Sequence, residues 1–234
     1  MMPSGISRIH LKKIDSTNDA CALNLDKSKK SVVVTADQQS CGRGRNNNSW
    51  YSPTGNIYYS FGFISKNIFK GLSVKTGLIV AETLHEVYGK KVFLKWPNDL
   101  IYFKKKIGGI LVESSSLNNL FKIVIGVGIN LKITTLEDHW GDLGLDLNNT
   151  DQKDKFIEKL TSKLQSLSKY DLECGWSEKW TELCAHRNQS IFVKPNMDKH
   201  IFMGVNNNGE AITKKAGIYN LITQESSIRV SGLY

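Results

Sequence analysis

The segment from Val92 to Leu131 constrains the fold more than any other part of the chain, because it holds four successive stretches with the residue pattern of β-strands. The connections between them are short, and the basic turn 104–106 joins the middle pair. Strands that follow one another so closely in sequence usually pair as neighbours. We therefore expect a meander built from residues 92–95, 100–103, 107–113 and 121–131.

Helices and further strands surround this meander. Apolar residues recur at helical spacing over 72–88, and Gly89 stands where a C-terminal cap belongs. The same spacing predicts helices over 156–167 and around 176–183, and a capping sequence predicts a helix that starts near residue 17. Further strands are predicted over 8–14, 32–35 and 56–64.

The pattern changes beyond Arg187, where short strands alternate with turns rich in glycine and asparagine. The pair Asn208-Gly209 is typical of a hairpin turn. We therefore expect two domains, 1–187 and 188–234. The second would be a small β-barrel or sheet, and a unit of that size needs to dock on the larger one to be stable.

Composition excludes several classes of protein. The chain is 40% hydrophobic and 23% charged and has no apolar run near the ~18 residues that span a bilayer, which predicts a soluble globular protein. Its start lacks the apolar core of a secretory signal, so we expect a cytoplasmic protein. No CxxC spacing occurs, which predicts free thiols and no structural zinc at Cys21, Cys41, Cys174 and Cys184.

The net charge of +9 raises the alternative of a nucleic-acid-binding protein. Such a protein would bind DNA or RNA with strong salt dependence. The lysines are dispersed along the chain rather than clustered, which argues against this alternative and against specific DNA binding. Only five arginines occur, and two of them flank Gly44.

Those two arginines lie in a long polar loop, 38–53, within the sequence Gly42-Arg43-Gly44-Arg45. The glycines allow a ligand to approach the backbone closely, and two guanidinium groups this near to each other can bind a phosphate. An ordinary solvated loop is the competing interpretation of this segment taken alone.

Three other segments combine small or rigid residues with polar ones. Lys95-Trp96-Pro97-Asn98-Asp99 places a cation, an aromatic ring and two short polar side chains at a strand edge. Lys106 precedes the pair Gly108-Gly109, and residues 125–131 read IGVGINL. Glycines inside apolar strands favour close approach of a ligand, although each segment alone is also compatible with plain packing.

Taken together, in this order and spacing, these segments resemble the biotin protein ligases, also called biotin–[acetyl-CoA-carboxylase] ligases. The resemblance spans the first half of the chain, and the C-terminal part matches loosely through Gly204, Gly209 and Arg229. The matching residues are Ser16-Thr17-Asn18, Gln39, Gly42 to Arg45, Trp50, the KWPND segment at 95–99, Lys106 with Gly109, and the GVGIN segment at 126–130.

The resemblance implies an α+β fold with a mixed sheet flanked by helices, like that of class II aminoacyl-tRNA synthetases, over 1–187. It implies an SH3-like β domain over 188–234. The implied reaction has two steps: biotin and ATP, with Mg²⁺, form biotinyl-5′-AMP, and a lysine of a biotin carboxyl carrier protein then takes the biotin. A lipoate or octanoate ligase or transferase of the same fold is the alternative. A homodimer is compatible with the sequence.

By the same resemblance, the catalytic residues are Arg45 and Lys106, whose cations offset the negative charge that gathers when a carboxylate meets ATP. Asp99 and Glu113 would be Mg²⁺ ligands or supporting groups, and the sequence does not choose between these roles. The biotin-binding residues would be Ser16, Thr17, Asn18, Gln39, Arg43, Gly44, Arg45, Lys106 and Gly109. The ATP-binding residues would be Arg43, Arg45, Trp50, Asn98, Lys106 and Asn130.

The chain departs from the family pattern after Arg45, where Asn46-Asn47-Asn48 replaces a glycine and a further basic residue, and at Cys41, where alanine is usual. No segment like the DNA-binding domain of repressor-type members precedes Arg8. We expect the loop 39–50 to become ordered over the adenylate, because its polar residues bury little apolar surface without a ligand.

Overall fold

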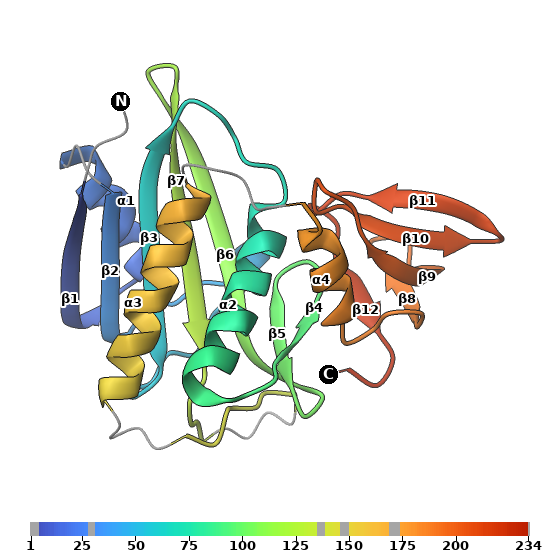
Figure 1. Ribbon diagram of the computed structural model, residues 1–234, viewed down its shortest axis with the longest axis horizontal. Helices are drawn as coiled ribbons and strands as arrows, with labels where there is room; N and C mark the ends of the chain where they lie inside the picture. The colour runs from blue at the N-terminus through green and yellow to red at the C-terminus, as the bar shows by residue number, and fades with distance from the viewer. Residues whose placement is uncertain (1–4, 28–30, 135–138, 146–149, 169–173, 234) are drawn as a thin grey trace.

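The structure is a computed structural model, and it describes residues 5–27, 31–134, 139–145, 150–168 and 174–233. Its larger sheet has the strand order β1-β2-β3-β7-β6-β5-β4 (Figure 1). Strands β1 and β2 pair in parallel, whereas the other neighbours pair antiparallel, so the sheet is mixed. The strands are β1 (Ile6–Ile14), β2 (Ser31–Gln39), β3 (Ile57–Ser65), β4 (Phe93–Lys95), β5 (Asp99–Tyr102), β6 (Lys105–Leu117) and β7 (Leu120–Ile129).

Four α-helices occur in the described part of the chain: α1 (Thr17–Lys27), α2 (Leu72–Tyr88), α3 (Thr150–Leu167) and α4 (Trp176–Glu182). A short 3₁₀ helix, η1 (Arg45–Asn47), lies in the polar loop. None of these helices is long and apolar enough to cross a membrane. Helix α2 has the predicted bounds, and Gly89 ends it in the left-handed conformation, with its N–H donating to His85 O.

The helices cover both faces of the larger sheet. Successive residues of a strand face opposite sides. In β2, Val33 packs into the large core together with α2 and α3, while Val32 and Val34 pack against Cys21 of α1. Figure 1 shows α2 and α3 together on one face. On the other face, α1 packs mainly on β2, β3 and β7, and Asn18 near its start also bonds Glu113 of β6.

Glycines leave room on the α1 face of the sheet. In β7, Ile125 and Val127 are buried in the large core, and the alternate positions Gly126 and Gly128 face the α1 side. A Cβ atom added at Gly128 would lie 2.7 Å from Nε1 of Trp50, and one at Gly126 would overlap the amide of Asn18. The alternation therefore fills one face with core residues and keeps the other face open.

The predicted meander is confirmed, since β4, β5, β6 and β7 pair in order. Two of its details differ from the prediction. Strand β6 continues to Leu117, which pairs with Leu120 across a tight turn in which Asn118 and Asn119 have positive φ. The turn before β6 is formed by Phe103 and Lys104, both with positive φ, so Lys106 belongs to the strand and not to the turn.

A second, antiparallel sheet follows with the order β11-β10-β9-β8-β12. It is built from β8 (Ser190–Val193), β9 (Asp198–Val205), β10 (Ala211–Lys215), β11 (Ile218–Ile222) and β12 (Ile228–Val230). The hairpin predicted at Asn208-Gly209 connects β9 to β10. This turn contacts the larger unit: the indole N–H of Trp96 donates to Gly209 O at 3.0 Å, and Gly209 lies against Gly71 before α2. The division into domains at 187/188 stays a prediction.

His186 lies where the two sheets meet, and it is fully buried. Its ring is 4.3 Å from that of Phe202, and its Nδ1 is 3.4 Å from Sγ of Cys184. Burial lowers the pKa of His186 to about 3, and the positive charge of nearby Lys95 acts in the same direction. The neutral imidazole is therefore the form that the folded chain accommodates.

We expect the free energy of unfolding to fall as the pH drops below 6.5, because the unfolded chain then protonates His186 while the folded chain does not. This contribution is complete above pH 6.5 and is lost toward pH 3, with a slope of at most about 1.4 kcal/mol per pH unit. Urea unfolding at about pH 5 and pH 7 measures the loss. The His186→Gln variant should lose less stability than the parent between pH 7 and pH 5. An equal loss in the two proteins would contradict the assignment to His186.

Candidate functional site

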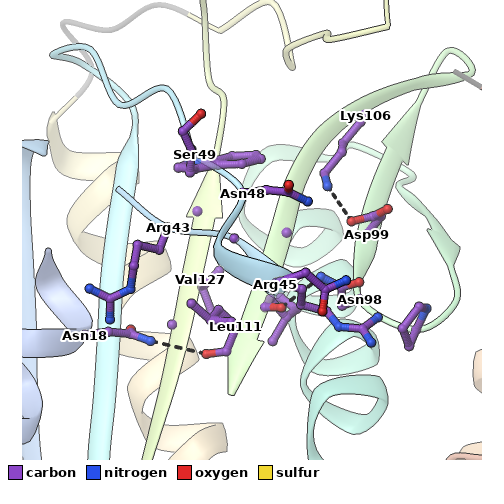
Figure 2. Close-up of a pocket in the computed structure, with 18 of the residues that line it drawn as sticks. Asn18, Arg43, Arg45, Asn48, Ser49, Asn98, Asp99, Lys106, Leu111 and Val127 are labelled. Atoms are coloured by element: carbon purple, nitrogen blue, oxygen red, sulfur yellow. Dashed lines mark hydrogen bonds and ion pairs between the residues drawn. The ribbon is translucent and has the colours of Figure 1, made fainter. Parts of the chain in front are cut away.

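A cavity of about 380 Å³ opens on the α1 face of the larger sheet, beside the glycines of β7. With the exception of Asn130, every residue that the sequence assigned to biotin or ATP lines it. Figure 2 shows Asn18 and Arg43 on one side and Lys106 and Asp99 on the other. The predicted residues in the lining are Ser16, Thr17, Asn18, Gln39, Arg43, Gly44, Arg45, Trp50, Asn98, Lys106 and Gly109.

One end of the cavity is polar and rigid because the start of α1 is fixed by hydrogen bonds. The backbone N–H and the hydroxyl of Thr17 both donate to Oε1 of Gln39, at 2.8 and 3.0 Å. Ser60 of β3, which sequence analysis did not identify, donates its hydroxyl to Oδ1 of Asn18 at 2.6 Å, and its oxygen lies 2.9 Å from Oγ1 of Thr17. These buried side chains therefore present fixed donors and acceptors to a polar ring system.

Arg43 is paired with two carboxylates. Its guanidinium donates to both oxygens of Asp19, and it lies 3.2 Å from Oε1 of Glu113. The hydrogen bond to Asp19 raises the pKa of Arg43, and the same bond lowers the pKa of Asp19. Glu113 also accepts from Nδ2 of Asn18 at 2.6 Å. The positive charge of Arg43 is thus balanced, and its bonds to Asp19 tie the polar loop to α1.

Arg45 is held differently, by neutral groups. It starts η1, and its Nη2 donates to three backbone carbonyls in the turn between β11 and β12: Gln224 O at 2.5 Å, and Glu225 O and Ser226 O at 3.3 Å each. Burial lowers the pKa of Arg45, and the field of Asp99 partly offsets this effect. These partners carry no net charge, so the positive charge of Arg45 is not cancelled by them.

Lys106 and Lys95 share one buried carboxylate. Nζ of Lys106 lies 2.6 Å from Oδ1 of Asp99, and Nζ of Lys95 lies 3.5 Å from Oδ2 (Figure 2 draws the Lys106 pair). Burial lowers the pKa of Lys95. The side chains of Lys95 and Asp99 are only 9% and 10% exposed, whereas Lys106 is 21% exposed at the cavity. Lys106 is thus the more accessible of the two cations.

An aromatic pair covers part of the cavity. The rings of Trp50 and Trp140 stack with centroids 4.7 Å apart, and Nζ of Lys106 lies 5.6 Å from the Trp50 ring. Trp140 was missed in the sequence, because it lies in a polar segment without periodicity, well after the GVGIN motif. Its backbone bridges to Lys106, which places it at the site.

Asn130 is absent from the lining of the cavity, and its predicted place near the nucleotide stays a prediction. It is fully buried, and its Nδ2 donates to Gly141 O at 3.0 Å. Its own carbonyl accepts from Leu143 N–H. These two bonds tie Asn130 to the segment that carries Trp140.

The charges in the lining favour an anionic ligand. Four cations line the cavity, and Arg43 is balanced by Asp19 and Glu113, which leaves Arg45, Lys95 and Lys106 against the single carboxylate of Asp99 in the lining. No group of three or more His, Cys, Asp or Glu residues that could hold a metal occurs in the described ranges. Asp99 and Glu113, the predicted candidates for Mg²⁺, are both paired with cations. They fit a supporting role better than that of metal ligands.

Comparison with known proteins agrees with this geometry. The model of the biotin/lipoate A/B protein ligase family matches residues 11–130. The bifunctional ligase/repressor BirA of Escherichia coli strain K12 is 30% identical over 224 residues, which cover 89% of this chain and 69% of that protein. This chain belongs to the biotin/lipoate A/B protein ligase family. The comparisons thereby confirm the resemblance on which the sequence analysis relied.

Other members of the ligase family extend the comparison. Biotin–protein ligase 1 of Arabidopsis thaliana is 34% identical over 127 residues, covering 51% of this chain and 35% of that protein. The structure of the Aquifex aeolicus biotin protein ligase, in complex with biotin and ATP, superposes with a TM-score of 0.78 at 24% identity. It covers 96% of this chain and 99% of that one, which confirms the predicted α+β fold.

Proposed function

We propose that this chain is a biotin protein ligase that activates biotin as biotinyl-5′-AMP and transfers it to a lysine of a biotin carboxyl carrier protein. One observation carries the proposal: the fixed polar start of α1, Lys106 and Arg45 all line the same cavity. The Arabidopsis thaliana relative named as a biotin–protein ligase, and the similar Aquifex aeolicus structure with biotin and ATP, support biotin over lipoate as the substrate.

The chemistry follows from the charges. A carboxylate repels nucleophiles, so it must become a mixed anhydride with AMP before an amine can attack it. Bringing that carboxylate against the α-phosphate of ATP gathers negative charge, which Lys106 and Arg45 are placed to offset. Lys106 would leave Asp99 to do so, and Lys95 would keep Asp99 partly neutralised.

The remaining roles are assigned on the same basis. Ser16, Thr17, Asn18 and Gln39 would bind the polar ring of biotin, and the Trp50–Trp140 pair would cover the adenine. Mg²⁺ would arrive with the phosphates of ATP, because the nearby carboxylates are already paired. Residues 1–187 would form the catalytic domain and 188–234 the SH3-like domain.

The location and assembly of the protein complete the proposal. We place the reaction in the cytoplasm, where the free cysteines of the chain fit a reducing compartment. The carrier protein and a second copy of this chain are the proposed protein partners, and specific DNA binding is not proposed.

The deciding experiment is ATP–pyrophosphate exchange with biotin, lipoate and octanoate measured side by side on the full chain. We expect exchange with biotin to exceed exchange with either fatty acid by at least about 10²-fold, because a site built to hydrogen-bond a polar ring loses those bonds with an aliphatic acid. Faster exchange with lipoate or octanoate would overturn the assignment of substrate.

A further inference from the structure

The turn between β11 and β12 belongs to the C-terminal sheet, yet it forms part of the cavity. Ser227 and Ile228 line the cavity, and the carbonyls of the three preceding residues hold the guanidinium of Arg45. The position of Arg45 therefore depends on where this turn lies.

A side chain fixes that turn. Nε2 of Gln224 donates to Asn208 O at 3.2 Å, in the turn between β9 and β10. That second turn is anchored on the larger unit through the bond from Trp96 to Gly209 O and through the close packing of Gly209 on Gly71. Gln224 thus makes two connections: its side chain bonds the anchored turn, and its backbone carbonyl bonds Arg45.

We propose that Gln224 is a positioning residue for adenylate formation and that it acts through Arg45. The inference rests on the proposed function and adds a residue to it. Carbonyl dipoles orient a guanidinium while leaving its net charge in place, so a cation held this way is oriented and still able to offset an anion. Arg43, whose charge Asp19 and Glu113 balance, shows the contrasting arrangement in the same loop.

The test is a double-mutant cycle on biotin-dependent pyrophosphate exchange by the full chain. Gln224→Met keeps the length of the side chain but removes its donor, and it should lower kcat about 10-fold with less than about a 2-fold change in KM for biotin. In an Arg45→Ala background, the same substitution should change the rate by less than about 2-fold, because residues that act through one another are not additive.

Gln189→Met is the matched control, since Gln189 is exposed and its amide bonds only Ala185 O in the described part of the chain. It should exchange at the parent rate. Gln224 is half-buried, so its replacement is not expected to unfold the chain. Urea unfolding of each variant checks that any change in rate is not caused by a loss of stability.

The outcomes separate this inference from the proposed function. A parent chain that fails to exchange with biotin overturns the proposed function itself. With an active parent, three results overturn the role of Gln224: a Gln224→Met variant at the parent rate, full additivity with Arg45→Ala, or a shifted urea midpoint with unchanged kcat. Reduced kcat together with non-additivity supports it.

Discussion

Replacing Lys106 by alanine is expected to lower the rate of biotin adenylate formation by about 10²-fold or more, as expected for removal of a group that stabilises charge in the transition state. Lys106 is the accessible partner of Asp99 and lies at the cavity, in a strand that is paired on both sides. Its backbone is therefore fixed while its ammonium group is able to exchange one anion for another. The loss should appear in kcat rather than in KM for ATP.

Single-turnover formation of the adenylate measures this effect, since it excludes product release. Lys105→Ala is the matched control, because Lys105 is the exposed neighbour on the same strand and does not line the cavity. Arg45→Ala should show a loss of similar size. Parent-like rates in both Lys106→Ala and Arg45→Ala would refute the assignment of the site, because solvated basic residues can be removed with little effect.

Replacing Asp99 by asparagine is expected to lower the free energy of unfolding by roughly 3 kcal/mol at neutral pH, because it leaves a buried lysine without its counter-charge. Lys95 is 8% exposed overall, and its pKa is already lowered by burial. The loss should shrink as the pH rises toward the ordinary lysine pKa of 10.5. Below that pH the unfolded variant binds more protons at Lys95 than the folded variant does, so the stability of the folded state increases with pH.

Urea unfolding of the parent and the Asp99→Asn variant at several pH values tests this expectation. A Lys95→Met/Asp99→Asn double variant provides the control, because it removes the buried cation together with its partner and should regain most of the lost stability. A loss that does not depend on pH, or a double variant less stable than Asp99→Asn, would show that the ion pair is not the cause.

Much of this site could be predicted from the sequence, because its parts are short motifs whose residues are unusual for plain turns or strands. The glycines of β7 are an example: their alternation with Ile125 and Val127 indicates a strand with one packed face and one open face. The strand order of the meander followed from short connections. The C-terminal end of β6 could not be predicted in this way. The residues that extend the strand toward the turn at Asn118-Asn119 are mostly polar, so no apolar pattern marks them as a strand.

The partners of the site residues could not be predicted, because they come from distant parts of the chain. The carbonyls that hold Arg45 belong to residues near 225, and backbone carbonyls leave no trace in a sequence. The surroundings of Asn130 could not be predicted for a related reason. An asparagine at the end of a glycine-rich strand suits both a ligand contact and an interior bond to Gly141, and only the fold distinguishes the two.

The cavity draws on both ends of the chain, from Ser16 to Ile228, and this has a consequence for synthesis. Domains emerge from the ribosome and fold in order, the N-terminal part first. The polar start of α1 can form early, but the wall that holds Arg45 does not exist until the turn between β11 and β12 has been released. A nascent chain that has not yet released residues 224–228 is therefore expected to hold an incomplete pocket, and we expect it to form no anhydride until they emerge.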